Sequence, residues 1–225
     1  MVYGYRNAAT TKLTARRNKV AGNSSGIFAY RVTDAEIVNN ISAKNRSYGI
    51  AVSVTGSGEA DVWNNSIVDN RYGLWHLGGR GTIRNNIIAN GDMKARSSNA
   101  FGVYRSGGTV DLGYNLLFGQ QRKYVNAKPG TGDVIKPPRF IDHAKGDYRL
   151  AAGSPAINAG TSPCKLTAVD IQGVSRPLFN AFEIGAFEYP EKSGSLRILN
   201  WGEMASPPTA LNGRVSFSSG NSRLP

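Results

Sequence analysis

The chain has a single cysteine, Cys164, among its 225 residues. One cysteine can form neither an internal disulfide nor a thiolate metal site, so we expect Cys164 to be a structural thiol. The sequence also lacks any run apolar enough to span a membrane, and residues 1–5 do not resemble a signal peptide. A strand-forming repeat that starts so abruptly nevertheless favours a secreted or cell-surface protein whose signal was removed or is not present in this chain, with a cytosolic protein as the alternative.

Acidic residues are few: 15 Asp and Glu stand against 27 Lys and Arg, a formal net charge of +12. This balance favours an acidic partner, namely an anionic polysaccharide, a nucleic acid or a membrane surface. The basic residues are scattered and no nucleic-acid-binding motif is present, so we do not expect nucleic-acid binding. The aspartates lack the spacing of a calcium loop. We therefore predict no metal site and no cofactor, although calcium remains compatible with the composition.

The sequence is rich in one short recurring motif built on asparagine. In this motif two asparagines follow an apolar residue. A further asparagine comes next, and then a Gly-aliphatic step, meaning a glycine followed by an aliphatic residue, as in Asn64-Asn65, Asn70 and Gly73-Leu74. The second asparagine of each copy recurs at intervals of 22, 25, 21 and 29 residues, at Asn18, Asn40, Asn65, Asn86 and Asn115. A repeat of this length, made of short strands and polar turns, is typical of a solenoid.

Each repeat contains three short apolar segments separated by turn residues, without helical periodicity. This pattern predicts an all-β fold, a right-handed parallel β-helix solenoid of about five coils over residues 1–140, with coils about 4.8 Å apart. A series of ordinary hairpins is the alternative. The repeated asparagine tolerates the left-handed backbone of a sharp corner, and its amide can hydrogen-bond to the equivalent amide one coil away. We therefore predict a structural asparagine ladder at the five positions given above.

Alternation along the strand after each Gly-aliphatic step predicts which side chains face outward. The aliphatic residues should stack inside the coil: Ile27, Ile50, Leu74 and Val103. The next residues should form an outer row: Phe28, Ala51, Trp75 and Tyr104. Aromatic planes suit the apolar faces of sugar rings, and arginine binds carboxylates in bidentate fashion. We predict a carbohydrate-binding face, with exposed aromatics lacking any ligand as the alternative, made of Phe28, Trp75, Tyr104, Arg46, Arg71 and Arg105.

The pattern changes after residue 140. Three segments follow in order, residues 153–160 (GSPAINAG), 170–177 (DIQGVSRP) and 183–189 (EIGAFEY). This set resembles the C-terminal signature of bacterial surface β-helix proteins that carry a choice-of-anchor domain, with Asn158 where that family usually has aspartate. The preceding repeats resemble the pectate-lyase-like superfamily in a more general way.

The resemblance implies a closing unit over residues 141–189. Its prolines cannot donate to a strand ladder, and its apolar residues can cover the end of the coil stack: Ile157, Ile184, Phe187 and Tyr189. Asp170, Arg176 and Glu183 should form a buried or half-buried charge cluster that fixes this cap, with a catalytic acid at Asp170 or Glu183 as the alternative. Residues 190–225 indicate a linker or the start of a further module. An uncapped N-terminal coil could also support stacking into an oligomer.

Enzymes of the superfamily that the repeats resemble include lyases and hydrolases of acidic polysaccharides. A lyase needs a base and a cation or arginine that stabilises the enolate, and a hydrolase needs paired carboxylates. The predicted outer row contains no acids, which leaves His76 and Arg105 as catalytic candidates, and a merely structural His76 is the alternative. We therefore predict a non-catalytic extracellular or cell-surface β-helix module, part of a larger protein, that interacts with acidic polysaccharide. A polysaccharide lyase or glycoside hydrolase is the alternative.

Overall fold

The computed structural model describes residues 2–3, 11–90, 100–162, 168–178, 181–190 and 215–219, and Cys164 lies outside them. The described part consists of strands, turns and irregular segments. It contains no helix with the length and apolar character needed to cross a membrane.

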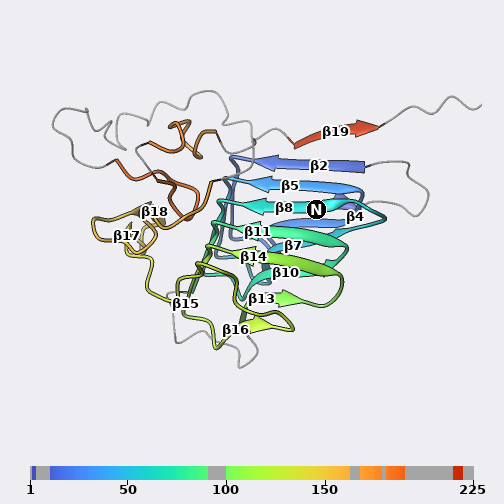
Figure 1. The fold of residues 1–225 in the computed structure, drawn as a ribbon, viewed down its shortest axis with the longest axis horizontal. Helices are drawn as coiled ribbons and strands as arrows, with labels where there is room; N and C mark the ends of the chain where they lie inside the picture. Colours follow the sequence, from blue (N-terminus) through green and yellow to red (C-terminus); the bar gives the residue numbers. More distant parts are fainter. Residues whose placement is uncertain are drawn as a thin grey trace, which may run out of the picture.

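Three sheets form the faces of a solenoid (Figure 1). Sheet A contains β1 (Val2–Tyr3), β4 (Ile27–Val32), β7 (Tyr48–Val54), β10 (Tyr72–Gly78), β13 (Phe101–Arg105) and β16 (Arg122–Val125). Sheet B contains β2 (Thr11–Arg16), β5 (Asp34–Val38), β8 (Glu59–Trp63), β11 (Arg80–Arg84), β14 (Thr109–Gly113) and β19 (Val215–Ser219). Sheet C contains β3 (Lys19–Ala21), β6 (Ile41–Ala43), β9 (Ser66–Val68), β12 (Ile87–Ala89) and β15 (Leu116–Phe118). A hairpin of β17 (Phe140–Asp142) and β18 (Asp147–Leu150) follows the coils.

The chain visits sheets A, B and C in turn, so that four complete coils run from β4 to β15. Equivalent strands of successive coils pair in parallel and in register. Ile83, for example, pairs with Val62 of the preceding coil and with Leu112 of the following one. The predicted all-β parallel β-helix is confirmed, with a coil count close to the expected one.

Aliphatic side chains from all three sheets fill the interior of the coil. Ile50, Leu74 and Val103 are paired neighbours in sheet A and are fully buried. Ile27 packs against the same core and is partly buried. Because a slip of one residue would exchange the two faces of a strand, this burial also fixes which residues point outward.

The second asparagine of each repeat lies inside the corner between sheets B and C. The Nδ2 of each asparagine donates to Oδ1 of the next, at 2.9 Å for the first three steps and 3.0 Å from Asn86 to Asn115. Each Oδ1 also accepts the backbone N–H of the preceding asparagine, as between Asn40 and Asn65 at 2.9 Å. Except for the half-buried Asn18, the ladder residues are fully buried. The ladder is continuous over all five positions.

The left-handed corner residue is the first asparagine of each pair, and not the second. Asn39, Asn64 and Asn85 have φ of 54°, 52° and 55°, whereas none of the ladder asparagines has a positive φ. The left-handed corner and the amide ladder, both predicted for a single asparagine, are therefore divided between two neighbouring asparagines. The first asparagine turns the backbone and directs its amide away from the coil, while the second forms the ladder.

Asp133 ends the ladder, where a sixth asparagine would otherwise lie. Its Oδ1 accepts the backbone N–H of Asn115 at 2.7 Å and the Nδ2 of Asn115 at 3.3 Å. Its Oδ2 accepts the hydroxyl of Tyr124 at 2.6 Å and the N–H of Gly130 at 2.7 Å. A carboxylate suits this position because the last member of the ladder only has to accept hydrogen bonds.

From β6 to β15, sheet C is largely apolar and almost completely buried on both faces, and the C-terminal block (described residues 140–162, 168–178 and 181–190) covers its outer face. In β12, Ile88 points into the coil core while Ile87 points outward, and both are buried. Ile184 of the block packs with Ile87 and Leu116. The block therefore lies along the side of the stack (Figure 1), and not over its apolar end as the sequence suggested. A sheet with two apolar faces needs a covering layer on both of them, which explains this position.

The outward-pointing asparagines fasten the C-terminal block to the coil. Asn39 Nδ2 donates to the Val169 carbonyl at 2.6 Å, and Asn85 Nδ2 donates to the Thr161 carbonyl at 2.8 Å. Asn64 makes the equivalent bond to Glu183 O at 3.1 Å. The repeated Asn-Asn pair thus serves both the interior of the coil and its junction with the block.

A buried charge cluster holds the C-terminal block together. Arg176 donates to Glu188 Oε1 and to the carbonyl of Gly185, both at 2.8 Å, and the ion pair is almost fully buried. Asp170 accepts three backbone N–H groups at 2.7 to 3.0 Å. Asp170 and Glu183 are buried beside this pair, but the ion-pair partner of Arg176 is Glu188, which is not one of the three residues predicted for the cluster. Because these side chains are buried, none of them reaches a substrate at the surface.

Glu183 should make the stability of the protein depend on pH. Burial and the neighbouring Glu188 carboxylate raise the pKa of Glu183 from 4.5 to about 9. The folded state therefore keeps a proton that the unfolded chain releases, so that stability falls as the pH rises from the ordinary pKa toward 9. We expect a slope of at most ~1.4 kcal/mol per pH unit, most of which Glu183→Gln should remove. Thermal unfolding of both proteins at several pH values measures this slope. If the stability of the two proteins changed with pH in parallel, the prediction would be contradicted.

Strand β19 lies antiparallel beside β2 at the edge of sheet B (Figure 1). Strand β1 pairs with β4 in sheet A. The tail after residue 190 thus contributes a strand to the solenoid. The open edge that suggested stacking into an oligomer is already paired at β2.

Candidate functional site

Five aromatic side chains gather on the outer surface of sheet A, and we call them the aromatic face: Tyr48, Tyr72, Trp75, Phe101 and Tyr104. They come from β7, β10 and β13, which are neighbours in the sheet. Strand pairing places Tyr48 beside Tyr72 and Trp75 beside Tyr104. Phe101 is buried, and the other four rings are partly exposed. The rings therefore form a continuous surface across three coils.

The rings of the aromatic face stack on one another. Trp75 and Tyr104 have centroids 6.0 Å apart and planes 3° apart. The centroid of Tyr72 lies 5.2 Å from that of Tyr48 and 4.9 Å from that of Phe101. Tyr48 and Trp75 join the two columns with centroids 4.7 Å apart. Because neighbouring rings restrict one another, the surface is preformed.

Alternation along the strands predicts only one column of this surface; the other column consists of Tyr48, Tyr72 and Phe101. Each of these residues directly precedes the glycine of the repeat. A Cβ at Gly73 would lie 2.6 Å from Ile88 Cγ2 and 2.3 Å from the Gly102 carbonyl oxygen. Glycine thus allows the chain to turn tightly against the core, and simple alternation does not hold across that turn. The aromatic-Gly-aliphatic triplet was the signal that could have revealed this column.

The charge around the aromatic face is positive. No described strand of sheet A contains an aspartate or a glutamate. Arg71 is exposed, and its guanidinium carbon lies 5.2 Å from the centroid of the Tyr72 ring. Arg46 is exposed at the equivalent corner one coil earlier. Burial raises the pKa of Tyr48, which keeps its phenol neutral. Stacked rings bordered by arginines suit a ligand with apolar faces and negative charges.

Phe28, which the sequence placed in the same row, stands apart from the aromatic face. The small side chain of Ala51 lies between Phe28 and Trp75 in their column. Phe28 stacks on Tyr30 instead, with ring centroids 6.1 Å apart.

His76 and Arg105 do not lie on the aromatic face. Alternation directs Tyr104 outward and Arg105 inward, where Arg105 is paired in register with His76. His76 is fully buried, and its Nδ1–H donates to the Gly107 carbonyl at 3.1 Å. Burial lowers the pKa of His76, so the ring stays neutral. This position removes His76 as a base that could contact a substrate, and it places Arg105 outside the predicted outer row of sugar-binding residues.

Acidic side chains gather instead on the outer face of sheet B. Strand pairing aligns four outward residues in one column: Glu36, Asp61, Thr82 and Asp111. Their intervals repeat those of the asparagine ladder, so this column could have been predicted from the sequence. Glu36 forms ion pairs with Lys12 at 2.7 Å and Arg16 at 2.8 Å. Burial and nearby Glu59 raise the pKa of Asp61.

The carboxylates of sheet B do not form a metal centre. Among the described residues, no group of three or more His, Cys, Asp or Glu side chains is placed to hold a metal ion. The ion pairs of Glu36 with its basic neighbours, and of Asp111 with Arg84, give these carboxylates a structural role within the sheet.

Comparison with known proteins supports the fold. A family model described as "Right handed beta helix region" matches residues 4–90. This match agrees with the stacked parallel coils and indicates their right-handed sense. Searches of curated proteins and of solved structures found no match to this chain.

Proposed function

We propose that this chain is a β-helix module that binds an acidic polysaccharide on the aromatic face and does not cleave it. The observation that carries the proposal is the set of five stacked rings on a sheet whose described strands contain no acidic residue. Aromatic planes pack against the C–H faces of sugar rings, and Arg71 can bind a carboxylate through its planar fork. The net charge of +12 favours a polyanion further.

A secreted or cell-surface location is part of the proposal, as is a larger parent protein. Both parts are supported by the resemblance of residues 140–189 to the C-terminal signature of surface β-helix proteins. Acidic polysaccharides are abundant outside the cell, which is consistent with that location.

Trp75→Ala should weaken binding to the acidic polysaccharide by about 10-fold, because a ring-stacking contact and its buried area are lost. The fold should remain intact, since the side chain points away from the core. Affinity electrophoresis in gels that contain alginate, pectate, hyaluronate, chondroitin sulfate or uncharged dextran measures the effect.

Arg71→Ala should weaken binding in a way that diminishes at high salt, because exposed charges are screened over about 8–10 Å. Arg80→Ala is the matched control: Arg80 is also exposed, but it lies on sheet B and donates to the Ser57 carbonyl. The control should retain most of the affinity. If every acidic glycan binds the Trp75→Ala, Arg71→Ala double variant as well as the parent protein, the binding surface lies elsewhere. Release of unsaturated uronate products from these glycans would contradict the non-catalytic part of the proposal.

A further inference from the structure

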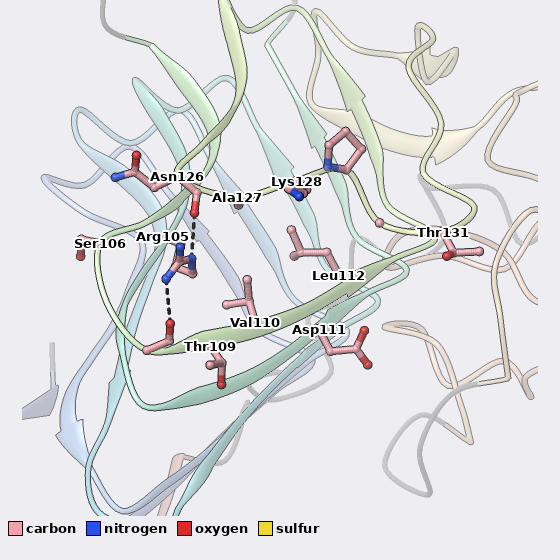
Figure 2. Close-up of a pocket in the computed structure, with 13 residues that line it drawn as sticks. Arg105, Ser106, Thr109, Val110, Asp111, Leu112, Asn126, Ala127, Lys128 and Thr131 are labelled. Carbon is pink, nitrogen blue, oxygen red and sulfur yellow. Dashed lines mark hydrogen bonds between the residues drawn. The ribbon is translucent and has the colours of Figure 1, made fainter.

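An open pocket of about 1020 Å³ lies at the C-terminal end of the coil. The turn between β13 and β14 forms one wall, and the segment 126–131 forms the other (Figure 2). Its floor is apolar, since Leu112 belongs to the coil core and Val110 and Ala127 pack against that core. The filled core of the solenoid lies behind this floor, so a molecule that enters the pocket cannot continue into the coil.

The pocket contains a guanidinium that is held in position. Arg105 Nε donates to the Asn126 carbonyl and Nη1 donates to the Gly108 carbonyl, both at 2.8 Å (Figure 2). These two bonds use two of the five N–H groups of an arginine. Lys128 is exposed on the same rim, while Asp111, the acid of the pocket, is paired with Arg84. The charge that remains available in the pocket is therefore positive.

The pocket lies next to the aromatic face, at the end of β13. Ser106 lines the pocket, and its Oγ accepts the Nε1–H of Trp75 at 2.9 Å. Tyr104, the last ring of the aromatic face along the coil axis, is the residue directly before Arg105. A glycan that lies on Trp75, as proposed above, would therefore have the pocket within reach past Ser106.

We propose that this pocket receives the terminal uronate residue of the polysaccharide, so that the protein recognises a chain end. The proposal rests on the function proposed above. The carboxylate of the terminal sugar would accept the remaining N–H groups of Arg105 and an ammonium N–H of Lys128. The apolar face of the sugar ring would pack on Val110, Leu112 and Ala127.

The test compares hexasaccharides with the intact polymer of whichever acidic glycan binds most tightly in the gels described above. Hexasaccharides offer many chain ends for their mass, whereas the polymer offers few. Arg105→Ala should weaken hexasaccharide binding, measured by calorimetry, by about 10-fold or more, because a charge-assisted hydrogen bond is lost. The effect of Arg105→Ala on binding of the polymer, measured at an equal mass of glycan, should be small. Trp75→Ala should weaken both ligands.

Arg105 also connects two segments of the chain, so a second variant is needed that leaves the fold unchanged. Lys128→Ala provides it, with Lys136→Ala as the control, because both lysines are exposed while only Lys128 lines the pocket. Lys128→Ala should weaken hexasaccharide binding several-fold at an unchanged melting temperature, and Lys136→Ala should not. If Arg105→Ala and Lys128→Ala leave hexasaccharide binding unchanged, or weaken hexasaccharide and polymer equally, the chain-end proposal is wrong. If Trp75→Ala still weakened the binding of both ligands, the aromatic face would remain the proposed binding surface. If Trp75→Ala weakened the binding of neither ligand, both proposals would be wrong.

Discussion

Asn65→Ala should lower the free energy of unfolding by roughly 3–5 kcal/mol, among the largest losses that a single substitution can cause. Asn65 is fully buried, and its Oδ1 accepts both the backbone N–H and the Nδ2 of Asn40 at 2.9 Å. Its Nδ2 donates to the carbonyls of Ile37 and Trp63 and to Asn86 Oδ1, at 2.8 to 3.0 Å. Alanine keeps the backbone but leaves several buried polar groups without partners. Urea denaturation of both proteins measures the loss.

Asn18→Ala is the matched control, since it removes the same side chain from the half-buried end of the same ladder. Asn18 Nδ2 donates to Asn40 Oδ1 and to the Arg16 carbonyl. Water can replace these bonds at an accessible position, so we expect a loss of about 1 kcal/mol or less. Equal losses for the two variants would show that burial of the ladder does not determine its contribution.

Arg176→Met should lower the free energy of unfolding by about 3–5 kcal/mol, because it leaves buried carboxylates without a countercharge. Glu188 loses its ion-pair partner, and Asp170 loses a nearby positive charge. Because the block covers the outer face of sheet C, its loosening should expose apolar residues such as Ile87 and Leu116. Chemical denaturation measures the loss, and binding of a hydrophobic dye at low denaturant detects the exposed face.

Adding Glu188→Gln to Arg176→Met removes the uncompensated charge as well. The double variant should therefore be more stable than Arg176→Met alone, which is the behaviour expected of a coupled buried pair. If the losses of the two single variants simply add, the ion pair does not hold the block in place.

The coil could be predicted from the sequence because its constraints are local and repeated. The spacing of Asn40, Asn65 and Asn86 fixes where each coil turns, and alternation around Leu74 fixes which neighbours point outward. Both depend on backbone geometry that is the same in every coil. Trp75 and Tyr104 were placed on the outer surface for the same reason.

Features that depend on contacts between distant segments could not be predicted in this way. The C-terminal block was expected over the end of the stack, but its position depends on which surface of the coil is apolar. Apolar residues at consecutive positions, such as Ile87 and Ile88, show that both faces of sheet C are buried, and this signal was available. Arg105 was grouped with Tyr104 by proximity in the sequence, although adjacent residues of a strand point to opposite faces.

Hydroxyl-radical footprinting of the aromatic side chains, with and without the bound acidic glycan, tests the proposed binding surface most directly. We expect protection of Tyr48, Tyr72, Trp75 and Tyr104 when the glycan is bound. Tyr114 and Tyr189 are partly exposed but lie outside sheet A, and their oxidation should not change. Protection of these two tyrosines, with unchanged oxidation of Trp75 and Tyr104, would contradict a glycan-binding function of the aromatic face.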